Sequence, residues 1–287
     1  MNISFSSSRS SAVICAEDSS RQPSRHNDRV PTVDVERYLE AVVKTAQDVL
    51  GLGFVGAYAA GSIALDAFQP DRSDIDIAVV CRSPLNQSTK RALIAQLRHR
   101  ALPCPARGLE LVVYTRTAAQ SGTADPGFEL ELNDGPAMGF RQSFEPANRP
   151  AADGAFWYGI DRSILHQSGR SLAGPPASKT FSDLPPEELR ALLIDSLHWW
   201  TARSNQSGRE SEVGTEEAVL GACRALVRHR DGRWLSKAAA GRRLLSTGYQ
   251  PAETIEQSIA ARSGGRPPSS GQALILQRRA LAEILAG

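Results

Sequence analysis

Apolar residues recur along the first part of the chain with two different periods. Between residues 35 and 50 they fall three and four positions apart, as in Val35, Leu39 and Val42, which predicts an amphipathic helix. A continuous apolar run over 54–60 follows a glycine-rich stop and predicts a buried strand. The chain therefore begins its ordered part with a helix followed by a strand.

Helical and strand-like patterns then alternate as far as about residue 132. Further predicted elements are a short helical stretch at 63–68, strands at 74–81, 108–115 and 128–132, and a helix at 88–102 capped by Ser88. Helices interleaved with strands are typical of an α/β or α+β domain with a mixed sheet.

The composition changes near residue 170. Prolines and glycines cluster at 174–176 and 185–186, which is typical of a linker. Beyond it the apolar spacing is helical, with helices predicted at 186–203, 216–230, 235–246, 252–262 and 272–285. We expect a mixed-sheet domain over 31–178, followed by an all-α helical bundle over 179–287.

Residues 1–30 differ from both parts. They contain nine serines and four arginines and have no apolar core like that of a secretory signal. We expect a disordered tail, with a start codon placed too early as the alternative.

Composition and charge exclude some classes of protein, namely those that bind nucleic acid mainly through its phosphates and those embedded in a membrane. There are 33 Lys+Arg against 31 Asp+Glu in 287 residues, a net charge of +2, which is unlike a protein that grips nucleic acid by its phosphates. No apolar run reaches the ~20 residues that span a bilayer. The four cysteines are scattered, with no metal-like spacing, which favours free thiols in a reducing cytoplasm.

Three carboxylates form the most informative pattern. Side chains alternate along a strand, so Asp74 and Asp76 point to one face, where their charges repel unless a cation such as Mg²⁺ lies between them. A turn capped by aspartate explains one of the two but not the pair. Glu110 lies on the next predicted strand, and Gly61-Ser62 before the pair would let a backbone approach a phosphate.

These motifs resemble a known family. Tyr58-x-x-Gly61-Ser62, Ser73-Asp74-Ile75-Asp76-Ile77 and Leu109-Glu110-Leu111-Val112 are similar to the polymerase-β-type nucleotidyltransferase domain. More narrowly, the chain resembles the bacterial aminoglycoside adenylyltransferases of the streptomycin/spectinomycin 3″ type. The similarity extends over roughly residues 35–285 and includes Ser171-Leu172-Ala173-Gly174-Pro175, Phe181-x-x-Leu184-Pro185, and Arg224 thirteen residues before Lys237.

The resemblance implies an ATP-dependent enzyme that adenylylates a hydroxyl of a small molecule, above all an aminoglycoside. It implies that Asp74 and Asp76 bind Mg²⁺, that Glu110 is the general base, and that Arg224 and Lys237 contact the ATP phosphates. Gly61, Ser62 and Ser73 are further nucleotide-binding candidates. We expect a cytoplasmic monomer that binds ATP and a small hydroxylated substrate, with nucleic acid and membranes not among its partners.

The acceptor stays open because the chain departs from the family in the cleft. The family uses a tryptophan and an acid there, whereas this chain has Asn-Asp-Gly-Pro at 133–136 and Ser-Glu-Val-Gly at 211–214. Glu131, Asp134 and Glu212 are acids that could meet a polycationic sugar, or simply be solvated. The alternatives are a nucleotidyltransferase for a protein or RNA end in a toxin–antitoxin system, a silent binding module of the same fold, and a small helical ribonuclease suggested by Arg224-x-x-x-x-His229.

Overall fold

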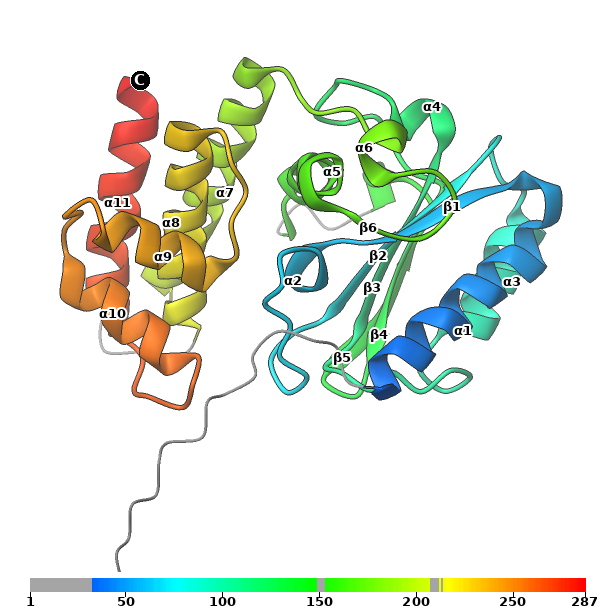
Figure 1. The fold of residues 1–287 in the computed structure, drawn as a ribbon, viewed down its shortest axis with the longest axis horizontal. Helices are drawn as coiled ribbons and strands as arrows, with labels where there is room; N and C mark the ends of the chain where they lie inside the picture. Colours follow the sequence, from blue (N-terminus) through cyan, green and yellow to red (C-terminus); the bar gives the residue numbers. More distant parts are fainter. Residues whose placement is uncertain (1–32, 149–152, 207–211, 213) are drawn as a thin grey trace, which may run out of the picture.

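The structure is a computed structural model and describes residues 33–148, 153–206, 212 and 214–287. The tail predicted at 1–30 lies outside the described residues. Figure 1 shows a sheet flanked by helices on both faces, with a helical bundle beside it.

The described residues form one six-stranded sheet in the order β5-β4-β3-β2-β1-β6. Strands β2 and β3 are parallel, and every other neighbouring pair is antiparallel, which confirms the predicted mixed sheet. The strands are β1 (Phe54–Ala59), β2 (Ile75–Cys81), β3 (Leu109–Thr115), β4 (Leu130–Gly135), β5 (Met138–Ser143) and β6 (Arg170–Ala173).

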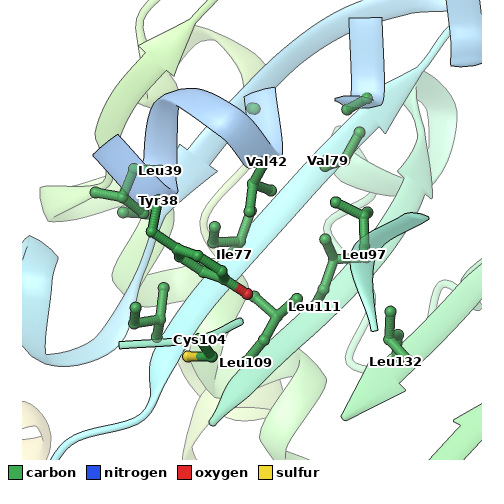
Figure 2. Packing of buried hydrophobic residues seen from close by; sticks show 14 of the residues in the cluster. Tyr38, Leu39, Val42, Ile77, Val79, Leu97, Cys104, Leu109, Leu111 and Leu132 are labelled. Atoms are coloured by element: carbon green, nitrogen blue, oxygen red, sulfur yellow. The ribbon is translucent and has the colours of Figure 1, made fainter. Parts of the chain in front are cut away.

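One face of the sheet is covered by α1 (Val33–Leu50) and α3 (Gln87–Leu97). The face is apolar because every second residue of β2, from Ile75 to Cys81, points into it, as the alternation predicted. Figure 2 shows Tyr38, Leu39 and Val42 of α1 packed over these strands. This core holds the sheet but contains none of the predicted site residues.

The other face carries a smaller apolar cluster under α5 (Phe156–Ser168) and α6 (Ala177–Thr180). Tyr58, Ala78 and Tyr114 of the sheet pack there against Phe181, which follows α6. Asp76 lies on this face, since it alternates with Ile75 and Ile77. Short helices α2 (Gly61–Ala64) and α4 (Arg116–Ala119), with 3₁₀ turns at Gly51–Gly53 and Pro146–Asn148, complete this half.

The second half is helical, as predicted. Helix α8 is central and packs against all four of its companions. The helices are α7 (Pro186–Gln206), α8 (Thr215–Asp231), α9 (Lys237–Leu245), α10 (Ala252–Ala261) and α11 (Ser270–Ala286). None of the described helices combines the length and the apolar character needed to cross a membrane.

Several elements differ from the sequence predictions. Helix α3 is capped by Asn86, whose Oδ1 accepts from the amide of Thr89 at 2.8 Å, and not by Ser88. Helix α5 and strands β5 and β6 were not predicted. Because β6 pairs with β1, the segment directly before the predicted linker belongs to the sheet. The domain division at 178/179 stays a prediction, since α5 also contributes to the core of the helical half.

Candidate active site

A row of polar residues crosses the α5 face of the sheet. Asp76 of β2 stands directly opposite Glu110 of β3 in the parallel register. Asn133 of β4 stands opposite Glu110, and Arg141 of β5 stands opposite Asn133. Residues directly opposite each other on neighbouring strands have their side chains in contact range. The predicted metal ligand and the predicted base are therefore side by side.

The carboxylates of this row destabilise one another's charges. Burial raises the pKa of Asp76 well above its usual value, and the charges of Glu110, Asp161 and Asp74 raise it further. Burial also raises the pKa of Asp74, against the opposing effect of Arg107 and Lys237. The ionised forms of Asp74 and Asp76 are therefore unfavourable unless a positive charge lies nearby. This is the repulsion between carboxylates that the D-x-D pattern implied.

Gly61 is required where it stands. Its φ of +51° is in the left-handed region, and a Cβ there would lie 1.9 Å from Oδ2 of Asp76. The amide of Ala60 donates to the carbonyl oxygen of Asp76 at 2.9 Å, so the turn after β1 is fixed against β2. Any side chain at 61 would displace the Asp76 carboxylate.

The side-chain oxygens at this turn are of the type that binds a hard divalent cation. Oδ1 of Asp74 and Oγ of Ser62 are buried and have no hydrogen-bond partner among the described residues. Mg²⁺ prefers oxygen ligands and is commonly held by one or two carboxylates together with substrate phosphates and water. Within the described ranges no three His, Cys, Asp or Glu side chains come together as a metal cluster. The unpartnered oxygens of Asp74 and Ser62 fit Mg²⁺ as ligands of this kind.

The two predicted phosphate-binding cations approach from the helical half. Arg224 lies on α8, with its guanidinium carbon 5.8 Å from the ring centre of Trp234. Burial lowers its pKa, while the charges of Asp161, Glu217 and Asp76 act to raise it. Lys237 begins α9, donates to Glu217, and lowers the pKa of both aspartates of the pair. Both cations are thus electrostatically coupled to the carboxylate site.

A short turn joins these two helices. Helix α8 ends at Asp231, and Gly232 follows with a φ of +65°. The side chain of Ser236 then caps α9. This turn places the start of α9 beside α8, so that Lys237 and Arg224 line one pocket together with Ile160 of α5.

Ser73 has a structural contact of its own. Its Oγ accepts from the amide of Gln69 at 3.0 Å, and its amide donates to the carbonyl oxygen of Gln69 at 2.7 Å. These bonds close the loop that leads into Asp74. A role for Ser73 in nucleotide binding stays a prediction.

The three acids considered for a cationic acceptor have different surroundings. Asp134 was expected on a loop but lies in β4 and faces α3, where its Oδ2 accepts from the amide of His99 at 2.9 Å. It is on the wrong side of the sheet for the site. Glu131 is buried on the site face and pairs with Arg141 at 3.2 Å. Glu212 pairs with Arg266 at the surface.

Asp161 is a site residue that sequence reasoning missed. It lies on α5, and its charge acts on both Asp76 and Arg224. The sequence does contain a sign of this residue, because Asp161 is the one acid within the largely apolar segment 156–165. Because that stretch was not recognised as a helix, nothing placed the acid over the sheet.

The motif Arg224-x-x-x-x-His229 does not form a joint site. Residues five apart on a helix are about 140° apart around its axis. Accordingly, Arg224 lines a pocket together with Ile160 of α5 and Lys237, whereas the ring of His229 lies near the C-terminal Gly287. This arrangement disfavours the ribonuclease alternative.

Comparison with known proteins agrees with this geometry. No family model matches the chain. A curated relative, the aminoglycoside (3″)(9) adenylyltransferase of Rhizobium radiobacter, is 25% identical over 198 residues, covering 66% of this chain and 70% of the relative. The spectinomycin adenyltransferase AAD(9) from Enterococcus faecialis, crystallised with ATP and spectinomycin, superposes with a TM-score of 0.64 at 16% identity. That match covers 87% of this chain and 98% of the other. The resemblance and the fold predicted from the sequence are therefore confirmed.

Proposed function

We propose that this protein is an ATP- and Mg²⁺-dependent nucleotidyltransferase that transfers AMP to a hydroxyl group of an aminoglycoside antibiotic. The observation that carries the proposal is the pairing of Asp76 with Glu110 across β2 and β3, opposite Arg224 and Lys237 of the helical half. The two matched proteins are adenylyltransferases of antibiotics, which supports the same reaction class here.

Each residue then has one task. Glu110 accepts the proton of the acceptor hydroxyl, whose oxygen attacks the α-phosphorus of ATP. The bond from that phosphorus to the bridging oxygen breaks, and pyrophosphate leaves with charge stabilised by Arg224 and Lys237. Mg²⁺, held by Asp74 and Asp76, would supply positive charge to the triphosphate. Gly61 and Ser62 would bring backbone and hydroxyl donors to the phosphates.

The acceptor is proposed from the charge of the site. The charges of Glu110, Asp161 and Asp74 all act on Asp76, so the site is acidic, which suits a ligand that carries amino groups. A near-neutral chain without a basic stripe argues against an RNA end as the acceptor. Both halves of the site come from one chain, so the proposed reaction needs no second copy. Buried free thiols at Cys81, Cys104 and Cys223 fit a reducing cytoplasm, where ATP is present.

The proposal is tested by incubating the protein with ATP and Mg²⁺ and with each member of an aminoglycoside panel that includes streptomycin and spectinomycin. Mass spectrometry should detect one AMP adduct on at least one antibiotic. The same panel with heat-inactivated protein is the control. If no antibiotic is modified while a protein or RNA in a cell extract takes up AMP, the acceptor assignment is wrong.

Arg224→Ala and Lys237→Ala should each weaken ATP binding by roughly ten- to a hundredfold. Charge-assisted contacts to phosphate contribute about 1.5–3 kcal/mol, and every 1.4 kcal/mol is about tenfold in affinity. Calorimetric titration with ATP and Mg²⁺ measures the change. His229→Ala is the matched control and should bind ATP as the wild type does, because no proposed step uses it. Unchanged affinity in the lysine variant would remove the helical half from the site.

A further inference from the structure

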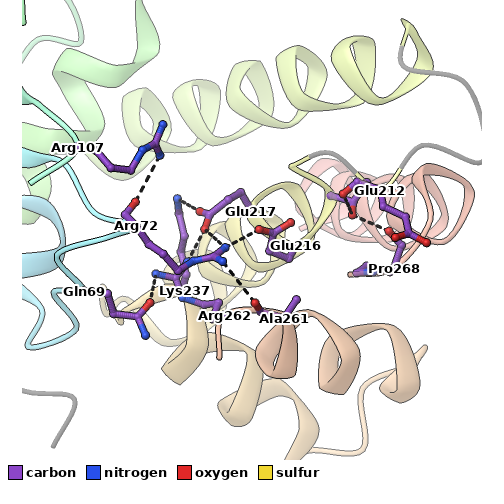
Figure 3. A network of polar contacts seen from close by, with 11 residues as sticks. Gln69, Arg72, Arg107, Glu212, Glu216, Glu217, Lys237, Ala261, Arg262 and Pro268 are labelled. Carbon is purple, nitrogen blue, oxygen red and sulfur yellow. Dashed lines mark hydrogen bonds and ion pairs between the residues drawn. The ribbon is translucent and has the colours of Figure 1, made fainter. Parts of the chain in front are cut away.

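The Lys237 ammonium group is held by an acid in the described structure. Glu217, in the first turn of α8, accepts from Lys237 through Oε2 and from Arg262 through Oε1. Figure 3 shows the carboxylate between the two cations, with Arg72 close by. The nearest Glu217–Arg72 distance is 3.8 Å between Oε1 and Nη2. The Glu217 carboxylate therefore forms ion pairs with three cationic side chains.

The network also joins the helical half to the loop before Asp74. Arg72 donates to Glu216 at 2.5 Å and to the carbonyl oxygen of Ala261 at 3.4 Å. Arg262 donates to Oε1 of Gln69 at 3.3 Å. The loop that carries Ser73 into the D-x-D pair is thus tied to α8 and α10. A change in the partners of Glu217 would therefore alter the contacts that hold the loop before Asp74.

Glu217 keeps its charge at every pH near neutrality. Burial acts to raise its pKa, but Lys237 and Arg262 lower it to about 2. Its position at the N-terminus of α8 also favours a negative charge. An ionised carboxylate gripped by a lysine and an arginine makes the same type of contact that a phosphate oxygen would make with them.

The network lies next to the proposed nucleotide site. The charge of Lys237 acts on Asp74 and Asp76, and the charge of Glu217 acts on Asp74 and Arg224. Lys237 therefore faces the aspartate pair as well as Glu217. A triphosphate carried on the pair would lie near Lys237, which shares the Glu217 carboxylate with Arg262.

We propose that Glu217 occupies the place of nucleotide phosphate on Lys237 and Arg262, that the triphosphate displaces it, and that Arg262 is a third triphosphate-binding residue. The displaced carboxylate moves toward Arg72, which keeps it paired. The inference rests on the proposed function, because it takes the triphosphate of ATP as the displacing anion.

The test is a calorimetric titration of Glu217→Gln and Arg262→Gln with ATP and with AMP, each with Mg²⁺. Glu217→Gln should bind ATP about tenfold more tightly, since no carboxylate competes for the two cations. Arg262→Gln should bind ATP roughly ten- to a hundredfold more weakly, since a charge-assisted contact is lost. AMP, which lacks the outer phosphates, should bind both variants within about twofold of the wild type. Arg243→Gln, which breaks the exposed pair with Asp231, is the matched control and should change neither affinity.

Thermal unfolding separates this role from a structural one. Glu217→Gln should lower the melting temperature of the ligand-free protein, because Lys237 and Arg262 lose their counter-charge. Saturating ATP should then raise that temperature by more than it does in the wild type. A purely structural Glu217 would lower the melting temperature in both states and leave ATP affinity unchanged or weakened.

Two outcomes overturn the proposal in different ways. If the wild type binds ATP and both variants bind it equally well, the assignment of Glu217 and Arg262 is wrong, while the proposed function stands. If the wild type binds neither ATP nor AMP, the proposed function and this inference are wrong together.

Discussion

Asp76→Asn is expected to abolish adenylyl transfer and to raise the melting temperature of the ligand-free protein. Turnover is lost because the variant removes one of the two carboxylates proposed to hold Mg²⁺. Stability rises because burial and the charges of Glu110, Asp161 and Asp74 raise the pKa of Asp76. An acid with a raised pKa in the folded state costs stability once pH exceeds its unfolded-state value, and asparagine carries no charge to penalise.

The measurement pairs turnover at saturating Mg²⁺ with thermal unfolding in a metal chelator. For a chain of this size each kcal/mol corresponds to about 2 °C, so a rise of a few degrees is readily seen near neutral pH. The rise should shrink as pH is lowered, because the wild-type Asp76 then takes up a proton. Glu256→Gln, an exposed acid in the middle of α10, is the control and should change neither quantity. Retained turnover in Asp76→Asn would contradict the metal assignment.

Glu110→Gln is expected to lower kcat by ~10²–10⁴ with little change in ATP affinity, because general-base help is lost while the shape of the side chain is kept. Steady-state rates with an aminoglycoside that the wild type adenylylates measure kcat, and calorimetric titration with ATP measures the affinity. Glu110 stands opposite Asp76 and can be mistaken for a metal ligand. A collapse of ATP affinity with kcat preserved would give it that role and leave the base unidentified.

The parts of the site that sequence predicted are those encoded by local patterns. Alternation along 74–81 placed Asp74 and Asp76 on one face and Ile75 on the other, and the register then brought Asp76 to Glu110. Likewise, helical spacing predicted the two helices that carry Arg224 and Lys237. Local geometry predicted the elements that carry these residues, whereas the phosphate-binding roles of Arg224 and Lys237 were implied by the family resemblance.

The parts that sequence did not predict depend on contacts between distant segments. Strand β6 has four residues and is recognisable only through its pairing with β1, more than a hundred positions earlier. Asp134 lies beyond the strand predicted at 128–132, yet the pairing of β4 with β3 extends the strand through it. Glu217 meets Arg262 across 45 residues, and no local pattern relates the two.

Transfer of the α-phosphorus of ATP tests the central claim most directly. The protein is incubated with Mg²⁺, with an aminoglycoside that the panel experiment identifies as an acceptor, and with ATP radiolabelled at either the α- or the γ-phosphorus. Label from the α position should appear on the antibiotic, and label from the γ position should appear only in pyrophosphate. Transfer of the γ label to the antibiotic would make the protein a phosphotransferase and would contradict the account.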